Sequence, residues 1–174
     1  MPDRVATFEK VSLGEFYDAM KDGFYSSIEP SMEAIERMYN NIVLPVRATS
    51  GSAGYDFVTP ISVQLRPGES INIPTGIRVR IEDGWWLLCL PRSGLGFKYR
   101  LQLANTAGVI DSDYYYSDNE GHIHAKITND CKADKIVTLN TGSRFMQGIF
   151  VPYGITYDDD AKDMRVGGFG STGL

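Results

Sequence analysis

Two segments of the sequence combine residue types that could bind and cleave a phosphorylated ligand. The first, GVIDSDY, places Asp111 and Asp113 beside Tyr114. A carboxylate can orient a water molecule and accept its proton, and a tyrosine ring can stack on a sugar or a base. The second, RVGGFGSTGL, surrounds Phe169 with Gly, Ser and Thr. Its backbone N–H groups and hydroxyls could wrap an anion, so the two segments together indicate nucleotide hydrolysis.

Three further motifs accompany these segments. GSAGYDF begins at Gly51, PRSGLG at Pro91 and RFMQG at Arg144, and NTAGVIDSDY extends the first segment back to Asn105. In this order and at comparable spacings, the five motifs resemble those of the trimeric deoxyuridine triphosphate nucleotidohydrolases, the dUTPases. Each motif alone is a weak signal because glycine-rich segments recur by chance, but five in register are specific. The resemblance covers roughly residues 42–174.

The resemblance implies an enzyme that hydrolyses dUTP to dUMP and pyrophosphate, which limits uracil incorporation into DNA and supplies dUMP for dTMP synthesis. It implies that Asp111 orients a water molecule for in-line attack on the α-phosphorus. Arg92, Ser93 and Gln147 would be the other catalytic residues, at the phosphates. The alternative for Asp111 is a turn residue that caps backbone donors, and for Asp113 that alternative is preferred.

The substrate-binding residues follow from the same resemblance. Tyr114 would stack beneath the deoxyribose, where a ribose 2′-hydroxyl would clash. The Asn105 amide offers a donor and an acceptor, which suits the edge of uracil. Arg144 would contact phosphate or brace Asp111. The full expected set is Gly94, Asn105, Gly108, Val109, Ile110, Tyr114, His124, Arg144, Arg165, Phe169, Gly170, Ser171 and Thr172.

The resemblance also implies Mg²⁺ as the cofactor. Asp56 would hold a water molecule on a Mg²⁺ that the three substrate phosphates chelate. Mg²⁺ dehydrates reluctantly and favours phosphate and water ligands over an all-protein cage. A tight turn is an equally good interpretation of GSAGYD. Two histidines and two cysteines do not favour a zinc site built by the protein.

Composition and charge restrict the remaining function classes. The 174 residues, 43% hydrophobic and 22% charged, are typical of one globular domain. A net charge of −5 argues against a general nucleic-acid-binding protein, which needs a basic face. The longest apolar run, WWLLCL, is too short to span a bilayer, and no signal-peptide pattern is found. We therefore expect a cytoplasmic protein with reduced cysteines and no membrane association.

Hydrophobic periodicity divides the chain into parts. Ser12 and Glu15 form a capping-box pattern before apolar residues at helical spacing, and a second helix is expected after Pro30. Further along, IRVRI and HIHAKI alternate with a period of two between Gly-containing turns, which predicts an all-β fold. The resemblance narrows this to a jelly-roll-like barrel or sandwich.

We therefore expect three parts. Residues 1–41 would form a short helical N-terminal extension, residues 42–157 the β domain, and residues 158–174 an acidic linker with a mobile Gly-rich tail that closes the active site. The resemblance further implies a homotrimer with active sites at the subunit interfaces.

The sequence departs from the family pattern in two places. The turn YYSDNEG is longer than the family's, and Arg165 lies one residue nearer to the tail motif than in many relatives. Three competing functions are also compatible with a fold of this kind. A dCTP deaminase shares the fold but needs a glutamate where this chain has Lys126. The second is a nucleotide-binding regulatory protein without turnover, and the third is a structural jelly-roll protein.

Overall fold

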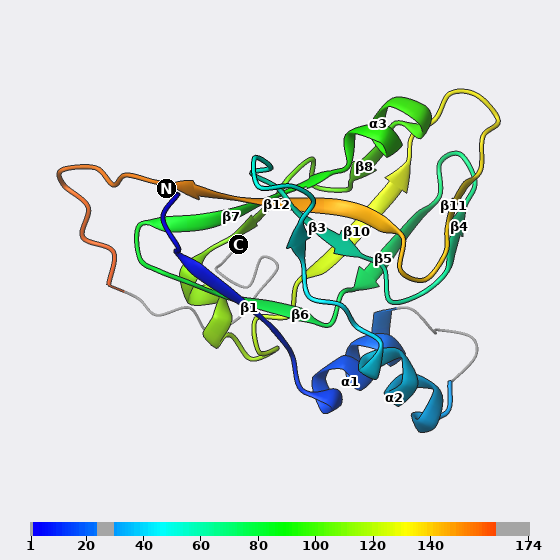
Figure 1. Ribbon diagram of the computed structural model, residues 1–174, viewed down its shortest axis with the longest axis horizontal. Helices are drawn as coiled ribbons and strands as arrows, with labels where there is room; N and C mark the ends of the chain where they lie inside the picture. Colours follow the sequence, from blue (N-terminus) through cyan, green and yellow to red (C-terminus); the bar gives the residue numbers. More distant parts are fainter. Residues whose placement is uncertain (1, 24–29, 163–174) are drawn as a thin grey trace.

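Strands predominate in the computed structural model, which describes residues 2–23 and 30–162 (Figure 1). The strands are β1 (Ala6–Lys10), β2 (Val46–Arg47), β3 (Tyr55–Val58), β4 (Val63–Leu65), β5 (Ser70–Pro74), β6 (Ile77–Ile81), β7 (Trp85–Pro91), β8 (Leu101–Leu103), β9 (Gly108–Ile110), β10 (His124–Asn129), β11 (Val137–Leu139) and β12 (Arg144–Pro152). The helices are α1 (Leu13–Gly23), α2 (Met32–Asn40), α3 (Ser93–Tyr99) and the 3₁₀ helix η1 (Ser112–Tyr116). The prediction of a mostly β fold is confirmed.

The strands pair antiparallel into four sheets within the described ranges. The largest has the order β2-β3-β12-β7-β9, so β12 lies between β3 and β7. A three-stranded sheet has the order β5-β10-β8, and β11–β4 and β1–β6 form two-stranded sheets. The pairing of β12 with β3 shifts in register between Arg144 and Met146. Directly after this shift, Met146 and Gln147 of β12 pair with the last two residues of β7.

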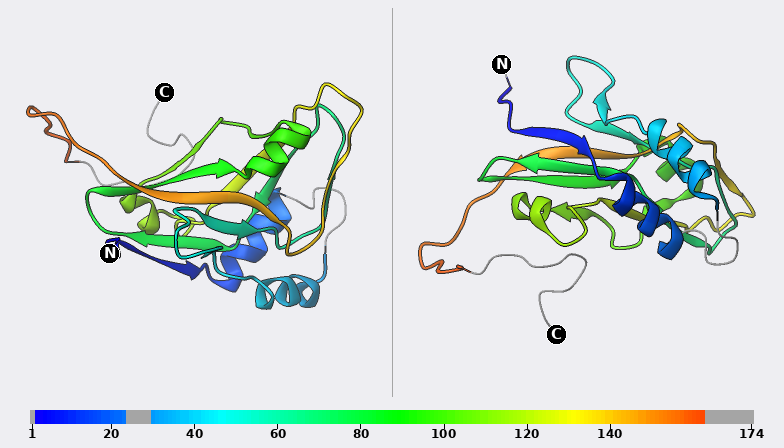
Figure 2. Two further views of the ribbon diagram at one scale, coloured as in Figure 1. Left: turned by 45° about the horizontal axis from the view of Figure 1, so that its top comes forward. Right: turned by 90° about the horizontal axis from the view of Figure 1, so that it is seen from below.

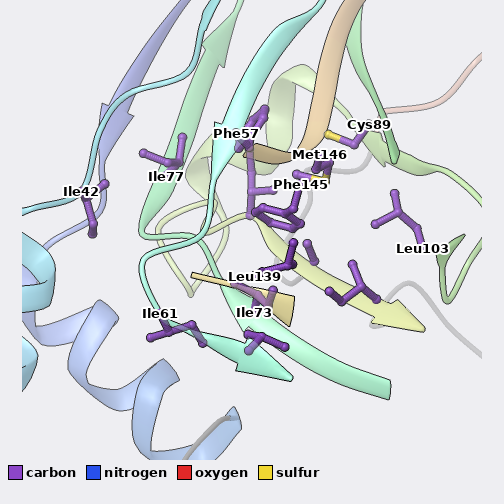
Figure 3. Close-up of a cluster of buried hydrophobic side chains, with 14 of the residues drawn as sticks. Ile42, Phe57, Ile61, Ile73, Ile77, Cys89, Leu103, Leu139, Phe145 and Met146 are labelled. Atoms are coloured by element: carbon purple, nitrogen blue, oxygen red, sulfur yellow. The ribbon is translucent and has the colours of Figure 1, made fainter. Parts of the chain in front are cut away.

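Alternation of apolar residues along the strands builds one core. In β6, Ile77, Val79 and Ile81 are buried whereas Arg80 between them is exposed, as period-two packing requires. Phe57 and Phe145 point into the same cluster as Met146 (Figure 3).

The N-terminal segment differs from the prediction. Residues 6–10 are not helical: they form β1, which pairs with β6 from Ala6–Ile81 to Lys10–Ile77. The physical reason is tertiary, because a strand partner about seventy positions away competes with local helix formation. The two helices begin at the expected places, with Ser12 Oγ accepting the Glu15 N–H at 3.1 Å and Ser31 as the N-cap of α2.

Helices α1 and α2 lie together at one end of the molecule, and residues 153–162 run away from the sheets at the other (Figure 2). Phe16 and Met20 of α1 and Ile35 of α2 are fully buried in the common core. Among the helices of the described residues, none is long and apolar enough to cross a membrane.

Candidate active site

A cavity of about 250 Å³ brings together six of the predicted substrate-binding residues. It lies between the hairpin that joins β8 to β9, strand β10, and the centre of the largest sheet. The lining residues are Cys89, Leu103, Asn105, Ala107, Gly108, Val109, Ile110, Tyr114, Ile123, His124, Ala125, Lys126 and Met146. Because six of the residues predicted to bind the substrate line it, we call this the nucleoside cavity.

The hairpin exposes its turn and backbone toward the cavity. Thr106 adopts a left-handed conformation, φ 70°, and its N–H bonds to the Leu103 carbonyl at 2.8 Å. Gly108 then allows β9 to approach β7, because a Cβ there would lie 3.1 Å from the Cβ of Cys89. Asn105 is exposed at the tip, and Val109 keeps 59% of its surface at the rim.

Tyr114 forms a fixed wall of the cavity. Its side chain is 4% exposed, and its hydroxyl donates to the His122 carbonyl oxygen at 2.8 Å. The same hydroxyl accepts from the Asn119 amide at 2.9 Å. With both functions of the hydroxyl used, the ring is held in one orientation.

His124 presents an uncharged ring to the cavity. Burial, together with the neighbouring His122, lowers the pKa of His124 to about 3. Its Nδ1 accepts from the Asn72 amide at 3.1 Å, and its ring centroid lies 4.3 Å from that of His122. The cavity lining therefore contains a neutral histidine together with the basic Lys126.

Glu15, His122 and His124 gather their carboxylate and ring nitrogens within 4.8 Å of one another. Both nitrogens of His122 are already engaged. Nε2 accepts the Gly76 N–H at 2.8 Å, so Nδ1 carries the proton and donates to Glu15 at 3.0 Å. A metal ion would have to break one of these buried hydrogen bonds, so the cluster is a hydrogen-bonded unit.

The cavity cysteine is not activated. Cys89 is 2% exposed, and burial raises the pKa of its thiol to about 12. A nucleophilic cysteine requires a lowered pKa, so Cys89 contributes shape only.

A second set of predicted residues forms a charged group around Asp56. Its side chain is 9% exposed and pairs through one oxygen with Arg92 Nε at 3.1 Å and through the other with Arg144 Nη1 at 3.3 Å. Gln147 lies opposite Asp56 on the neighbouring strand. Gly54 lies close to the Gln147 side chain, because a Cβ at Gly54 would come within 2.8 Å of the Gln147 Oε1 atom. We call Asp56, Arg92, Arg144 and Gln147 the charged group.

Comparisons with known proteins show the family of the chain. A model of the dUTPase family matches residues 40–173. The chain belongs to the dUTPase family. The deoxyuridine 5′-triphosphate nucleotidohydrolase of Lactococcus lactis is 42% identical over 135 residues, 76% of this chain and 89% of that protein. The relative from Hahella chejuensis is 39% identical over 146 residues, 79% of this chain and 91% of that protein.

Solved dUTPase structures are similar in fold. The crystal structure of dUTPase from Streptococcus mutans has a TM-score of 0.58 and 37% identity, over 65% of this chain and 88% of that one. Staphylococcus bacteriophage 80alpha dUTPase with dUPNHPP has a TM-score of 0.58 and 25% identity, over 77% of this chain and 94% of that one. The chain is therefore similar, in sequence and in fold, to enzymes that are named for the hydrolysis of deoxyuridine triphosphate.

Asp111 lies where the cavity ends. It follows Ile110 of β9 and is the N-cap residue of η1, yet its side chain makes no capping hydrogen bond. Asp113, two residues further along the chain, is exposed.

The two sets of residues remain separate within one chain. Among the described residues, no member of the charged group lines the nucleoside cavity. Ser93 and Gly94, the first two residues of α3, directly follow Arg92 and are exposed. The predicted tail residues lie outside the described residues: Arg165, Phe169, Gly170, Ser171 and Thr172.

Some site features carry no signal in the sequence. Arg144 pairs with Asp56, an arrangement that neither of its two predicted roles included. Lys126, at the position where a deaminase requires a glutamate, lines the cavity. The contact of Asn119 with Tyr114 depends on the fold of the long turn, which no local pattern specifies.

Proposed function

We propose that this dUTPase binds the uracil and deoxyribose of dUTP in the nucleoside cavity, with the triphosphate at a charged group. The observation that carries the proposal is the lining of that cavity by residues of the hairpin, η1 and β10, most of which the five-motif resemblance assigns to the substrate. Hydrolysis between the α- and β-phosphates then gives dUMP and pyrophosphate.

Base selection rests on Asn105 and the backbone from Gly108 to Ile110. Uracil alternates carbonyl oxygens and an N–H, which an amide and a strand backbone can match. The amino group of cytosine would face a donor and lose a hydrogen bond on burial, which excludes it. Tyr114 excludes a ribose 2′-hydroxyl by occupying the space beneath the sugar.

Asp111 orients the attacking water and accepts its proton. Its position directly after the cavity strand supports this role, because the α-phosphate must leave the cavity next to the sugar. Arg92, Gln147, Ser93 and the Gly94 backbone stabilise the phosphate oxygens as charge develops. The tail residues would complete the phosphate contacts and place Phe169 over the base.

Asp56 fits Mg²⁺ only through water. Each of its oxygens faces an arginine, so a direct metal bond would place three cations around one carboxylate. A carboxylate has about four acceptor positions, so it can still accept a hydrogen bond from a metal-bound water. Mg²⁺ would neutralise charge on the phosphates that chelate it.

A homotrimer accounts for the separation of the two sets of residues. If one copy supplies the cavity and another the charged group, the complete site lies at a subunit interface. Large apolar side chains are available for such contacts, with Phe97 93% and Ile155 73% exposed. We extend the proposal to a jelly-roll-like β domain over 42–157, an N-terminal extension over 1–41, a closing tail over 158–174 and a cytoplasmic location.

The test is pyrophosphate release from dUTP, dCTP, dTTP and UTP with Mg²⁺, together with ammonia release from dCTP. We expect turnover of dUTP alone and no ammonia. Ammonia from dCTP would establish deamination, and tight dUTP binding without turnover would establish a regulatory function. Light scattering should give three times the chain mass, and a fully active monomer would contradict the shared site.

A further inference from the structure

We propose that the N-terminal extension is a positioning element for the sugar end of the nucleoside cavity. The inference rests on the proposed function of that cavity. We use "N-terminal brace" for β1 and α1 together with their connection, residues 6–23. The brace holds the segment 115–122, which follows the wall residue Tyr114, through three carboxylate contacts.

The two partners lie outside the regions that carry the family motifs. The brace lies before the region that the dUTPase family model matches, which begins at residue 40. The turn 115–121 is the longer, polar turn of this sequence. Strand β1 lies alongside β6, and β6 in turn contacts η1, so the two segments meet in space although about 100 positions separate them (Figure 1).

The first contact is made by Glu9 of β1. Its carboxylate accepts the Tyr115 hydroxyl at 2.8 Å. The Arg78 guanidinium lies 3.7 Å from the centroid of the Tyr115 ring and 3.5 Å from the Glu9 carboxylate. The residue after Tyr114 is therefore held on both its ring face and its hydroxyl.

The second contact joins the turn to the start of α1. The Glu120 carboxylate accepts the Ser12 N–H at 2.7 Å and approaches Arg78 at 3.8 Å. In a capping box the N3 residue, here Glu15, would accept that N–H. Because Glu120 takes this place from the distant turn, the Glu15 carboxylate can bind elsewhere.

Glu15 makes the third contact, with His122. It accepts the Nδ1–H at 3.0 Å, while Nε2 accepts the Gly76 N–H at 2.8 Å. Glu15 thereby selects one tautomer and one orientation of a fully buried ring. Phe16, the next residue, is fully buried and anchors α1 independently of this contact.

His122 transmits the constraint to the cavity. Its carbonyl oxygen accepts the Tyr114 hydroxyl at 2.8 Å, and its ring lies against His124 at 4.3 Å. Tyr114 and His124 both line the cavity. The brace therefore acts through His122 on two walls of the sugar and base site.

The test compares Glu15→Ala with Glu15→Gln, whose amide oxygen can still accept the Nδ1–H. For Glu15→Ala we expect KM for dUTP to rise about tenfold, with kcat changed less than about threefold, because ground-state and transition-state binding are lost equally. The preference for dUTP over UTP should fall by about tenfold. Glu15→Gln should stay within about twofold of wild type. Exposed Glu36 of α2 supplies the matched control, and Glu36→Ala should match wild type.

A nitrogen-15 spectrum of the histidine rings tests the same contact in the unaltered protein. We expect His122 protonated at Nδ1, and an Nε2-protonated ring would overturn the proposal. Turnover of dUTP by the wild-type protein, measured in the same series, distinguishes failure of the proposed function from failure of the brace proposal. If the wild type does not turn over dUTP, the proposed function is refuted. If wild type is active and Glu15→Ala equals Glu36→Ala in KM and in sugar preference, the brace proposal alone is refuted.

Discussion

The nucleoside cavity and the charged group are built by opposite physical means. The cavity is lined mainly by backbone, apolar side chains and a neutral histidine, with Asn105 and Lys126 as further polar residues. Its wall residue Tyr114 is buried with both hydroxyl functions bonded. The charged group consists of ion pairs whose arginines, Arg92 and Arg144, keep 40% and 49% of their side-chain surface exposed. In the proposed function, one region would supply selectivity through its shape and the other would supply affinity for phosphate through local charge.

The difference explains how an acidic protein can bind a triphosphate. With a net charge of −5, the chain has no general attraction for polyanions. Two arginines around one carboxylate leave a local excess of one positive charge, and they are pre-oriented by that carboxylate. Changes in the cavity should therefore alter selectivity and stability, whereas changes in the charged group should alter turnover with little effect on folding.

The largest effect is expected at Asp111, where the two regions must meet. Asp111→Asn retains the shape of the side chain but not its ability to accept a proton. We expect kcat to fall by about 10²–10⁴-fold, with binding of a non-hydrolysable dUTP analogue retained. Single-turnover kinetics and calorimetry measure the two quantities. Exposed Asp113→Asn is the control, and comparable turnover of the two variants would assign the water to another residue.

A smaller effect is expected from Asp56→Asn. Both arginines lose their partner charge and the proposed water contact to Mg²⁺ weakens, so we expect kcat to fall about 10–100-fold and more Mg²⁺ to be needed. Asp56 is buried, but both arginines are half-exposed and water screens their charges, so the free energy of unfolding should change by less than about 2 kcal/mol. Titration with Mg²⁺ and urea unfolding test this.

The control for Asp56→Asn is Asp130→Asn, which removes a carboxylate paired with Arg100 and Lys132 outside the site. It should leave kcat unchanged. A Mg²⁺ requirement identical in wild type and Asp56→Asn would show that Asp56 serves only to order the arginines.

Substitution of Tyr114 should have the opposite effects to Asp56→Asn, because it should change sugar preference and stability. Tyr114→Ala opens space beneath the sugar, so the preference for dUTP over UTP should narrow by at least about tenfold. Stability should also fall, by about 3–5 kcal/mol, because a buried aromatic side chain is lost. Tyr114→Phe keeps the ring and should keep the preference. If Tyr114→Ala retains it, sugar selection lies in the 115–121 turn.

Local patterns predict the local features of this molecule. The alternation in IRVRI corresponds to β6, and the Ser12 cap marks the start of α1. Strand β1 is not predicted, because its partner β6 lies far along the chain. The helical pattern after Ser12 also leads to the expectation that all of residues 1–41 are helical. Pairing between distant segments depends on tertiary packing, which one sequence does not display.

In the candidate site, too, the sequence predicts the residues but not the pairings between distant segments. Motif order points to the residues of the cavity and of the charged group, since residue type and spacing carry that chemistry. The pairing of Arg144 with Asp56, and that of Glu15 with His122, follows from strand register and helix docking. Glu15 shows the limit most clearly: the capping-box pattern correctly places a helix start, but Glu120 supplies the carboxylate that the pattern assigns to Glu15.

The smallest effect concerns the neutral His124 ring in the cavity. The pKa of His124 is lowered to about 3 by burial and by His122, whereas an unfolded histidine titrates near about 6.5. Between these values the unfolded chain binds a proton that the folded chain does not, so the contribution to stability is complete above pH 6.5 and is lost as the pH falls toward 3. From pH 7 to pH 5 we expect about 2 kcal/mol of this loss.

His124→Gln isolates this contribution, because the variant cannot titrate at the site while His122 and every carboxylate are retained. Urea unfolding at pH 7 and pH 5 should show a smaller decline for His124→Gln than for wild type. If the free energy of unfolding declines equally in wild type and His124→Gln, the His124 ring accepts a proton in the folded state. The cavity would then accommodate a charged ring.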